Sequence, residues 1–296
     1  MSVHEWFGYR LDRLESSGDL VRQEECPFIE GPCTKTFNDG TVSGVCAIHQ
    51  QKAGAVICCP NRLYGGNHKV LADVASDAFG QDLPLTVGNA GAVTQARQLG
   101  GAIAVFGKNY GGELRLPQRK GRGAYFVDWV LARLDGDGKL VDFVAVEVQT
   151  IDTTGSYKPA VEALRAGEVG LPPVKVGLNW ENVNKRILPQ VIYKGHVLRG
   201  EPLCAKGLYF ITPRQVYERI LDRLAGRLKP YAKQPGAVTF LHYDYAPTPA
   251  VGSSPAELVL TGQLTTTVDQ IALAFTAPDN LPPNGVYEAA IRATLR

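Results

Sequence analysis

The sequence predicts a mixed α/β fold, with a mixed β-sheet flanked by helices, in which one β-hairpin takes a central place. Residues Ala124–Leu134 and 142–150 are rich in β-branched and aromatic side chains, as strands are, and the turn sequence DGDGK separates them. Apolar residues with helical spacing over Lys69–Gly80 and Pro213–Lys229 predict helices before and after the hairpin. The apolar run Gly207–Pro213 predicts a further, buried strand.

The remaining elements follow from the same two periodicities. Strands are predicted over Pro84–Gly88, Gly101–Lys108 and Ala237–Tyr245, and a strand followed by a helix over Glu257–Phe275. Helices are predicted over Gly91–Gly100, Glu181–Leu198 with an interruption at Pro189, and Tyr287–Arg296.

Length and composition are those of an ordinary globular chain. The 296 residues suffice for one large or two modest domains. Hydrophobic residues make up 45% and charged residues 20%, and the net charge of +2 excludes a histone-like polycation but not a DNA-binding face. The sequence has neither a secretory signal pattern nor an apolar stretch of about 18 residues, so we expect a cytoplasmic protein with reduced thiols and no membrane partner.

The second strand of the hairpin brings polar side chains onto one face. Val146 and Val148 occupy one face, and Glu147 and Gln149 occupy the other. If the hairpin turns through a two-residue or four-residue loop, Asp128 lies opposite Glu147, with Cβ atoms about 4.5–5.5 Å apart. A five-residue loop would send Asp128 to the other face.

Two carboxylates that face each other across a sheet repel, at a cost of up to about 1 kcal/mol. The pair Asp128 and Glu147 therefore indicates a divalent cation between them. The alternative is a hairpin with a solvated polar face, but an Asp within an otherwise apolar strand favours the metal site. Glu113 precedes the hairpin and is expected either to reach the same site or to be an exposed turn residue.

Five of the six cysteines gather between Cys26 and Cys59. In a chain without a secretory signal, such clustering indicates a metal site rather than disulfides, although free cysteines are also common core residues. A tetrahedral site needs four ligands. Adjacent side chains of an extended segment point in opposite directions, so only one of Cys58 and Cys59 binds, and we expect Cys59. His49 and His68 are alternative ligands.

A basic segment just before the hairpin contains Arg115, Arg119, Lys120 and Arg122. It is expected either to contact phosphates or to be a solvated run of charge. The phosphate-cradling sequence G-x-x-x-x-G-K-(S/T) does not occur, so no nucleotide cofactor is expected.

An ordered set of short motifs resembles the NotI-type restriction endonucleases, which are PD-(D/E)xK nucleases with a four-cysteine metal site. The matching segments are CPF at Cys26, CTK at Cys33, GVC at Cys46, CPNR at Cys59, GGEL at Gly111–Leu114, VDW around Asp128, EVQTID, GSY and NVNKR. The resemblance is strongest between Cys26 and Tyr157 and weaker in the carboxyl-terminal third.

The resemblance implies a four-cysteine region in residues 1–68, followed in residues 69–296 by a PD-(D/E)xK catalytic domain with a carboxyl-terminal extension. It implies one structural iron or zinc per chain, held by Cys26, Cys33, Cys46 and Cys59. It also implies a catalytic Mg²⁺ held by Asp128, Glu147 and the carbonyl oxygen of Val148, with Gln149 catalytic and Glu113 assisting.

Gln149 stands where the general nuclease pattern has lysine. Its amide can position a water but brings no positive charge, so more of the electrostatic work falls on the metal.

The activity implied is that of a type II restriction endonuclease. Such an enzyme makes Mg²⁺-dependent, sequence-specific double-strand breaks in DNA and leaves 5′-phosphates, and we expect a homodimer on a palindromic site. The alternative is a non-catalytic DNA-binding or regulatory protein that keeps the scaffold. The presence of Asp128, Glu147 and Gln149 together favours the enzyme.

Overall fold

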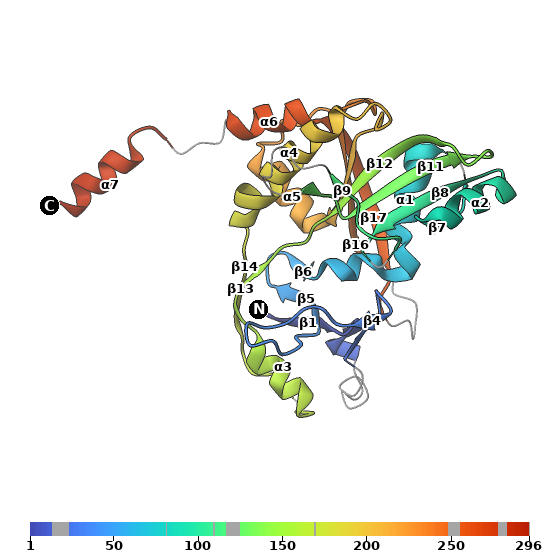
Figure 1. The fold of residues 1–296 in the computed structure, drawn as a ribbon. Helices are drawn as coiled ribbons and strands as arrows, with labels where there is room; N and C mark the ends of the chain where they lie inside the picture. Colours follow the sequence, from blue (N-terminus) through green and yellow to red (C-terminus); the bar gives the residue numbers. More distant parts are fainter. Residues whose placement is uncertain are drawn as a thin grey trace.

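The computed structural model describes residues 1–13, 24–80, 82–108, 110–116, 125–168, 170–247, 255–277 and 283–295. Within these residues a mixed seven-stranded sheet forms the centre (Figure 1). In spatial order its strands are β17 (Leu258–Thr267), β16 (Ala237–Tyr245), β15 (Leu208–Pro213), β12 (Leu140–Val148), β11 (Trp129–Asp135), β8 (Gly101–Gly107) and β7 (Leu85–Val87). β15 is parallel to both of its neighbours and β7 is parallel to β8, whereas the other pairs are antiparallel. This is the mixed α/β architecture that the sequence predicts.

Helices cover both faces of this sheet. One face packs against α1 (Gly65–Phe79). The other face carries α2 (Ala90–Leu99), α4 (Leu188–Arg199), α5 (Arg214–Arg223) and α6 (Val268–Thr276). The remaining helical segments are α3 (Lys158–Arg165), α7 (Val286–Thr294), the 3-10 helices Leu11–Arg13 and Pro60–Tyr64, and a π-helix at Val183–Ile187 that runs into α4. None of the described helices is both long enough and apolar enough to cross a membrane.

A second, smaller sheet belongs to the amino-terminal region. Its strands are β2 (Tyr9–Arg10), β1 (Ser2–Trp6), β5 (Val45–Gln50) and β6 (Gly54–Ile57), in that spatial order. Three two-stranded pairs complete the described strands: β3 (Glu25–Cys26) with β4 (Gly31–Pro32), β9 (Arg115–Leu116) with β10 (Tyr125–Phe126), and β13 (Thr153–Ser156) with β14 (Lys175–Leu178).

A buried ion pair within the amino-terminal region also binds the end of a strand of the central sheet. Nε of Arg62 lies 2.7 Å from a carboxylate oxygen of Glu5, and the two residues are 1% and 0% exposed. The hydroxyl of Tyr245, at the end of β16, donates to the same carboxylate. Removing Glu5 or Arg62 would leave a buried, uncompensated charge. The hydrogen bond from Tyr245 connects this pair to the central sheet.

The register of the hairpin is the predicted one. Trp129 pairs with Val146 and Arg133 with Asp142, as predicted. A bulge follows, so that Leu134 pairs with Leu140 and residues Gly136–Lys139 connect the two strands. Because the period of a strand is two, a slip by one residue would move Val144, Val146 and Val148 out of the core that they form with α1. Burial of each such side chain is worth about 1.5–3 kcal/mol, which fixes the register.

Two predicted elements differ from the structure. The predicted strand Ala124–Leu134 is interrupted, because β10 pairs with β9 and β11 begins only at Trp129. The predicted helix Pro213–Lys229 is too long. It ends at Arg223, where the chain turns through Leu224 into Ala225, whose φ of 53° is left-handed and incompatible with a continuing helix.

The helix predicted over Lys69–Gly80 is confirmed, including its end. Gly80 caps α1 with a φ of 66°, a conformation that glycine adopts without strain. The first residues of α1 as bounded above, Gly66, Asn67 and His68, are left-handed, so regular helical geometry begins only at Lys69.

Candidate active site

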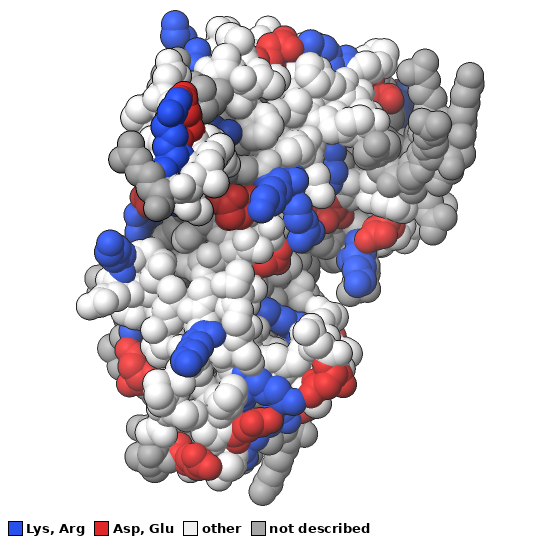
Figure 2. Space-filling model, turned by 90° about the vertical axis from the view of Figure 1, so that its left-hand side faces the viewer, with Lys and Arg blue, Asp and Glu red and all other residues white. Residues whose placement is uncertain are grey.

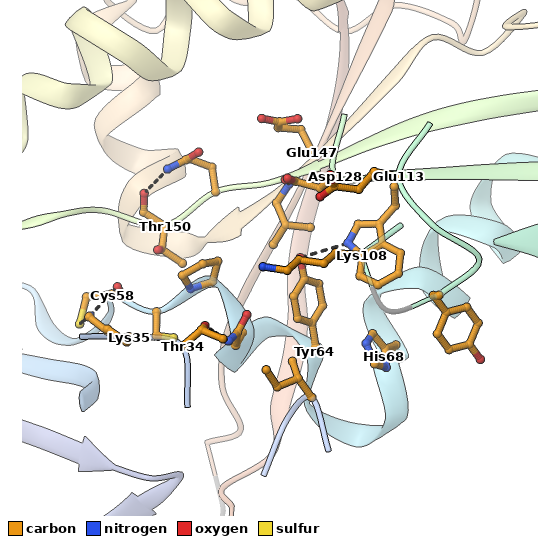
Figure 3. Close-up of a pocket in the computed structure, with 18 of the residues that line it drawn as sticks. Thr34, Lys35, Cys58, Tyr64, His68, Lys108, Glu113, Asp128, Glu147 and Thr150 are labelled. Atoms are coloured by element: carbon orange, nitrogen blue, oxygen red, sulfur yellow. Dashed lines mark hydrogen bonds between the residues drawn. The ribbon is translucent and has the colours of Figure 1, made fainter. Parts of the chain in front are cut away.

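A cleft of about 630 Å³ lies between the end of the hairpin and the amino-terminal region (Figure 3). All five residues predicted for the nuclease site line it: Glu113, Asp128, Glu147, Val148 and Gln149. The facing wall includes Thr34, Lys35, Cys58 and Asn61 of the amino-terminal region. The cleft therefore brings together the two parts of the sequence that were singled out for metal chemistry.

Asp128 lies immediately before β11 and reaches the neighbouring strand through its side chain. Its Oδ2 accepts a 2.8 Å hydrogen bond from the backbone N–H of Val148. This contact replaces backbone pairing at that point, which explains why the ladder begins at Trp129. The N–H and C=O groups of one strand residue point to the same neighbour, so the carbonyl of Val148 also faces the Asp128 side.

Glu147 is 6% exposed and has one oxygen paired and one without a partner. Nζ of Lys194, on α4, lies 2.5 Å from Oε1. Oε2 is buried and has no hydrogen-bond partner among the described residues. Burial, and then the charge of Asp128, raises the pKa of Glu147 to about 7 although Lys194 opposes the shift. Burial also raises the pKa of Asp128.

These groups fit a hard divalent cation. Mg²⁺ prefers oxygen ligands and is usually held by one or two carboxylates. Asp128, the unpartnered Oε2 of Glu147 and the carbonyl of Val148 offer such oxygens in one cleft. A cation there would compensate two carboxylates whose burial otherwise disfavours their charge.

Glu113 and Gln149 are the other two side chains predicted for the site. Glu113 is exposed, yet its charge contributes to the raised pKa of Asp128, so the two carboxylates are neighbours. The amide of Gln149 donates a 3.1 Å hydrogen bond to the carbonyl of Thr150. Both side chains line the cleft, and the Gln149 amide has further hydrogen-bonding capacity for a water or a substrate.

Two lysines of the site escaped the sequence analysis. Lys194 is 47 residues from Glu147 in the chain and comes to it only through the packing of α4 on the sheet. Lys108, at the end of β8, is exposed, and its side chain points into the cleft (Figure 3). No ion pair or hydrogen bond involves its ammonium among the described residues.

An aromatic cluster forms one end of the cleft. The ring of Tyr64 stacks on His68 with centroids 5.2 Å apart, and both contact the indole of Trp129. Tyr110 packs against His68 and Trp129. Burial lowers the pKa of His68, so the imidazole is neutral at pH 7. His68, considered above as a cysteine-site ligand, therefore belongs to this cluster.

The four predicted cysteine ligands are neighbours in the amino-terminal region. Burial raises the pKa of Cys26, Cys46 and Cys59, and nearby groups add to the shift: Cys33 acts on Cys26, Glu5 and then Cys59 on Cys46, and Cys58 and then Cys33 on Cys59. Cys58 instead contacts Lys35, whose Nζ lies 3.1 Å from its sulfur. All six cysteines are free. As placed, no three His, Cys, Asp or Glu residues in the described part of the chain form a metal cage, so these thiols would have to draw closer to bind an ion.

The distribution of charge on the surface does not by itself indicate a DNA-binding face. On the face shown in Figure 2, basic and acidic side chains are interspersed. Of the basic segment before the hairpin, Arg119, Lys120 and Arg122 lie outside the described residues, as does the side chain of Arg115.

Residues 7–203, more than half of the chain, match the model of a protein family described as Restriction endonuclease NotI. No curated protein matches the chain. The matched region contains the cysteine-rich segments, the hairpin and Lys194.

Proposed function

The chain belongs to the NotI restriction endonuclease family, and from this premise we propose that it is a Mg²⁺-dependent type II enzyme of the PD-(D/E)xK class. It cuts both strands of DNA at a specific sequence and leaves 5′-phosphates. A homodimer would read a palindromic site, because a two-fold axis relates its two copies of the cleft. The cytoplasm is the compartment that we propose for it.

The buried, unpartnered Oε2 of Glu147 supports this proposal most directly. A buried carboxylate oxygen without a partner is costly, by about 1–3 kcal/mol or more for a charged group. Proteins keep such groups where function needs them. Next to Asp128, this oxygen would serve to bind a divalent cation that arrives with the substrate or from the solvent.

Bound Mg²⁺ would act as a Lewis acid on the scissile phosphate and would lower the pKa of a coordinated water. Asp128, Glu147 and the carbonyl of Val148 would hold it. Gln149 would orient the water for in-line attack, with its amide released from Thr150. Lys108, which has no protein partner among the described residues, would contact a phosphate oxygen of the DNA.

We also propose a structural iron or zinc at Cys26, Cys33, Cys46 and Cys59. Four thiolates suit either ion, and a closed site leaves no position open for substrate. Its role would be to stabilise the amino-terminal wall of the cleft.

Cleavage of a long, unmethylated DNA tests the function. The purified protein with Mg²⁺ should give discrete fragments with ligatable 5′-phosphates, and EDTA should abolish them. Asp128→Asn should bind the same DNA without cutting it. A protein that binds DNA but leaves it intact under all divalent cations would instead be the non-catalytic DNA-binding protein considered above.

A further inference from the structure

Lys194 is held in place on α4, next to Glu147 of the candidate site. Its helix, α4, buries Leu188, Val191 and Leu198 against the central sheet. Gly195, the next residue, lies so close to α6 that an added Cβ would come within 2.9 Å of Val268. The backbone at position 194 therefore has little freedom to move, so the Lys194 side chain extends to Glu147 from a fixed position.

The contact between Lys194 and Glu147 differs from a surface ion pair. Nζ lies 2.5 Å from Oε1, and the two side chains are only 13% and 7% exposed. The other described lysine–carboxylate pairs have more exposed partners; in the pair of Lys233 with Asp77 the side chains are 27% and 25% exposed. Shielding from solvent makes the charge of Lys194 act strongly on what lies next to it.

The contact also decides which oxygen of Glu147 remains for a cation. Lys194 binds Oε1, while Oε2 has no partner among the described residues. At position 149, the first residue after β12, a neutral amide lines the same cleft. Among the described residues, Lys194 is thus the cation bound directly to Glu147, and its charge also acts on Asp128.

We propose that Lys194 is a positioning residue for DNA cleavage: its ammonium fixes Glu147 through Oε1, leaves Oε2 to the divalent cation, and supplies the positive charge that residue 149 lacks. The inference rests on the proposed function. It assigns the charge of the site to a helix that packs on the sheet rather than to the strand that carries the carboxylates.

The test uses Lys194→Met, which removes the ammonium but keeps most of the side-chain length. Its single-turnover cleavage at saturating Mg²⁺ should fall roughly 10²-fold, the loss expected when one preorganised electrostatic group is removed. Ca²⁺ should still raise the melting temperature of Lys194→Met, because both carboxylates remain. Lys194→Arg should keep more activity than Lys194→Met. The matched control, Lys233→Met, breaks an ion pair remote from the cleft and should cleave like the wild type.

Moving the charge separates positioning from a purely structural role. Adding Gln149→Lys to Lys194→Met should recover at least about tenfold of the lost rate, since it returns an ammonium to the cleft that Glu147 lines. Cleavage by Lys194→Met within threefold of wild type would overturn the inference. The inference would also be overturned if Lys194→Met lost both cleavage and the rise in melting temperature with Ca²⁺, and if adding Gln149→Lys restored neither. Asp128→Asn in the same assay keeps the two proposals apart: its continued cleavage would refute the proposed function itself.

Discussion

Oδ2 of Asp128 lies 2.8 Å from the backbone nitrogen of Val148 and accepts its hydrogen bond. This one contact ties the start of β11 to the end of β12 and places a carboxylate beside Glu147. It gives Asp128 two separable roles, one as a hydrogen-bond acceptor and one as a charge.

Replacing Asp128 separates these roles. Asp128→Asn keeps an oxygen acceptor but loses the charge, whereas Asp128→Ala loses both. Both variants should cleave DNA at least about 10²-fold more slowly. In thermal or urea unfolding, the free energy of unfolding of Asp128→Ala should be about 1–2 kcal/mol lower than that of Asp128→Asn, because alanine leaves the N–H of Val148 without a partner. Asp137→Asn, in the exposed hairpin loop, is the control. Equal stability of the Ala and Asn variants would contradict the acceptor role.

The raised pKa of Glu147 predicts how the metal-free protein responds to pH. Burial moves this pKa from 4.5 to about 7, so the native state binds the proton more tightly than the unfolded chain. The resulting stabilisation is complete below pH 4.5 and is lost as the pH rises to about 7. The contribution is on the order of 3 kcal/mol.

Urea unfolding in EDTA between pH 4 and 8 measures this effect as a difference between wild type and Glu147→Gln. The wild type should lose stability relative to the variant as the pH rises, and Mg²⁺ should restore it above pH 7, where the carboxylate is ionised. Parallel curves for the two proteins would show that Glu147 keeps an ordinary pKa.

The hairpin could be predicted because its determinants are local. Alternation of Val146 with Glu147 fixes the faces. The predicted register holds from Trp129 to Arg133, although a bulge between Arg133 and Leu134, which the sequence did not predict, lies next to the turn. The interruption of the first strand could not be predicted, because it depends on a side-chain contact between Asp128 and the backbone of Val148.

The two lysines of the site, Lys194 and Lys108, could not be predicted from the sequence for a different reason. Lys194 reaches Glu147 only after α4 has packed on the sheet, and nothing in its local sequence distinguishes it from a surface lysine. Lys108 enters the cleft because β8 ends beside the hairpin. Local periodicity predicts which elements form, but the partners of their side chains depend on tertiary packing.

Lys108 should contribute to DNA affinity. Its ammonium points into the cleft, and no interaction with another described residue would have to be broken for it to bind a phosphate. Lys108→Ala should weaken binding in Ca²⁺, and the slope of log affinity against log salt should fall by about one. Lys139→Ala in the hairpin loop, with a side chain 77% exposed, is the control. An unchanged salt slope for Lys108→Ala would remove this lysine from the DNA interface.

The cysteine cluster should hold one metal ion per chain. Protein purified without chelator should contain stoichiometric iron or zinc, and Cys26→Ser should lose the ion and unfold more easily. Because burial raises the pKa of Cys26, Cys46 and Cys59, binding must release protons, and the affinity should rise with pH.

Two cysteines serve as controls for the metal site. Cys58 contacts Lys35, and Cys204 lies far along the chain beside Gly207. Replacing either with Ser should leave the metal content unchanged. Elemental analysis without stoichiometric iron or zinc in the wild type would count decisively against the site.

Gln149 provides the last prediction, because it is where the chain departs from the general nuclease pattern. Its amide donates to the carbonyl of Thr150 at 3.1 Å and lines the same cleft as Glu147. Gln149→Ala should lower the single-turnover rate roughly 10²–10³-fold, as expected when a preorganised hydrogen-bonding group is lost. Mg²⁺ affinity should change much less, since both carboxylates remain. Gln149→Lys in the otherwise unchanged protein should be at best partly active, because a second ammonium beside Lys194 competes with Mg²⁺ for the carboxylates. If Gln149→Ala cleaves at the wild-type rate, another group such as Glu113 must orient the water.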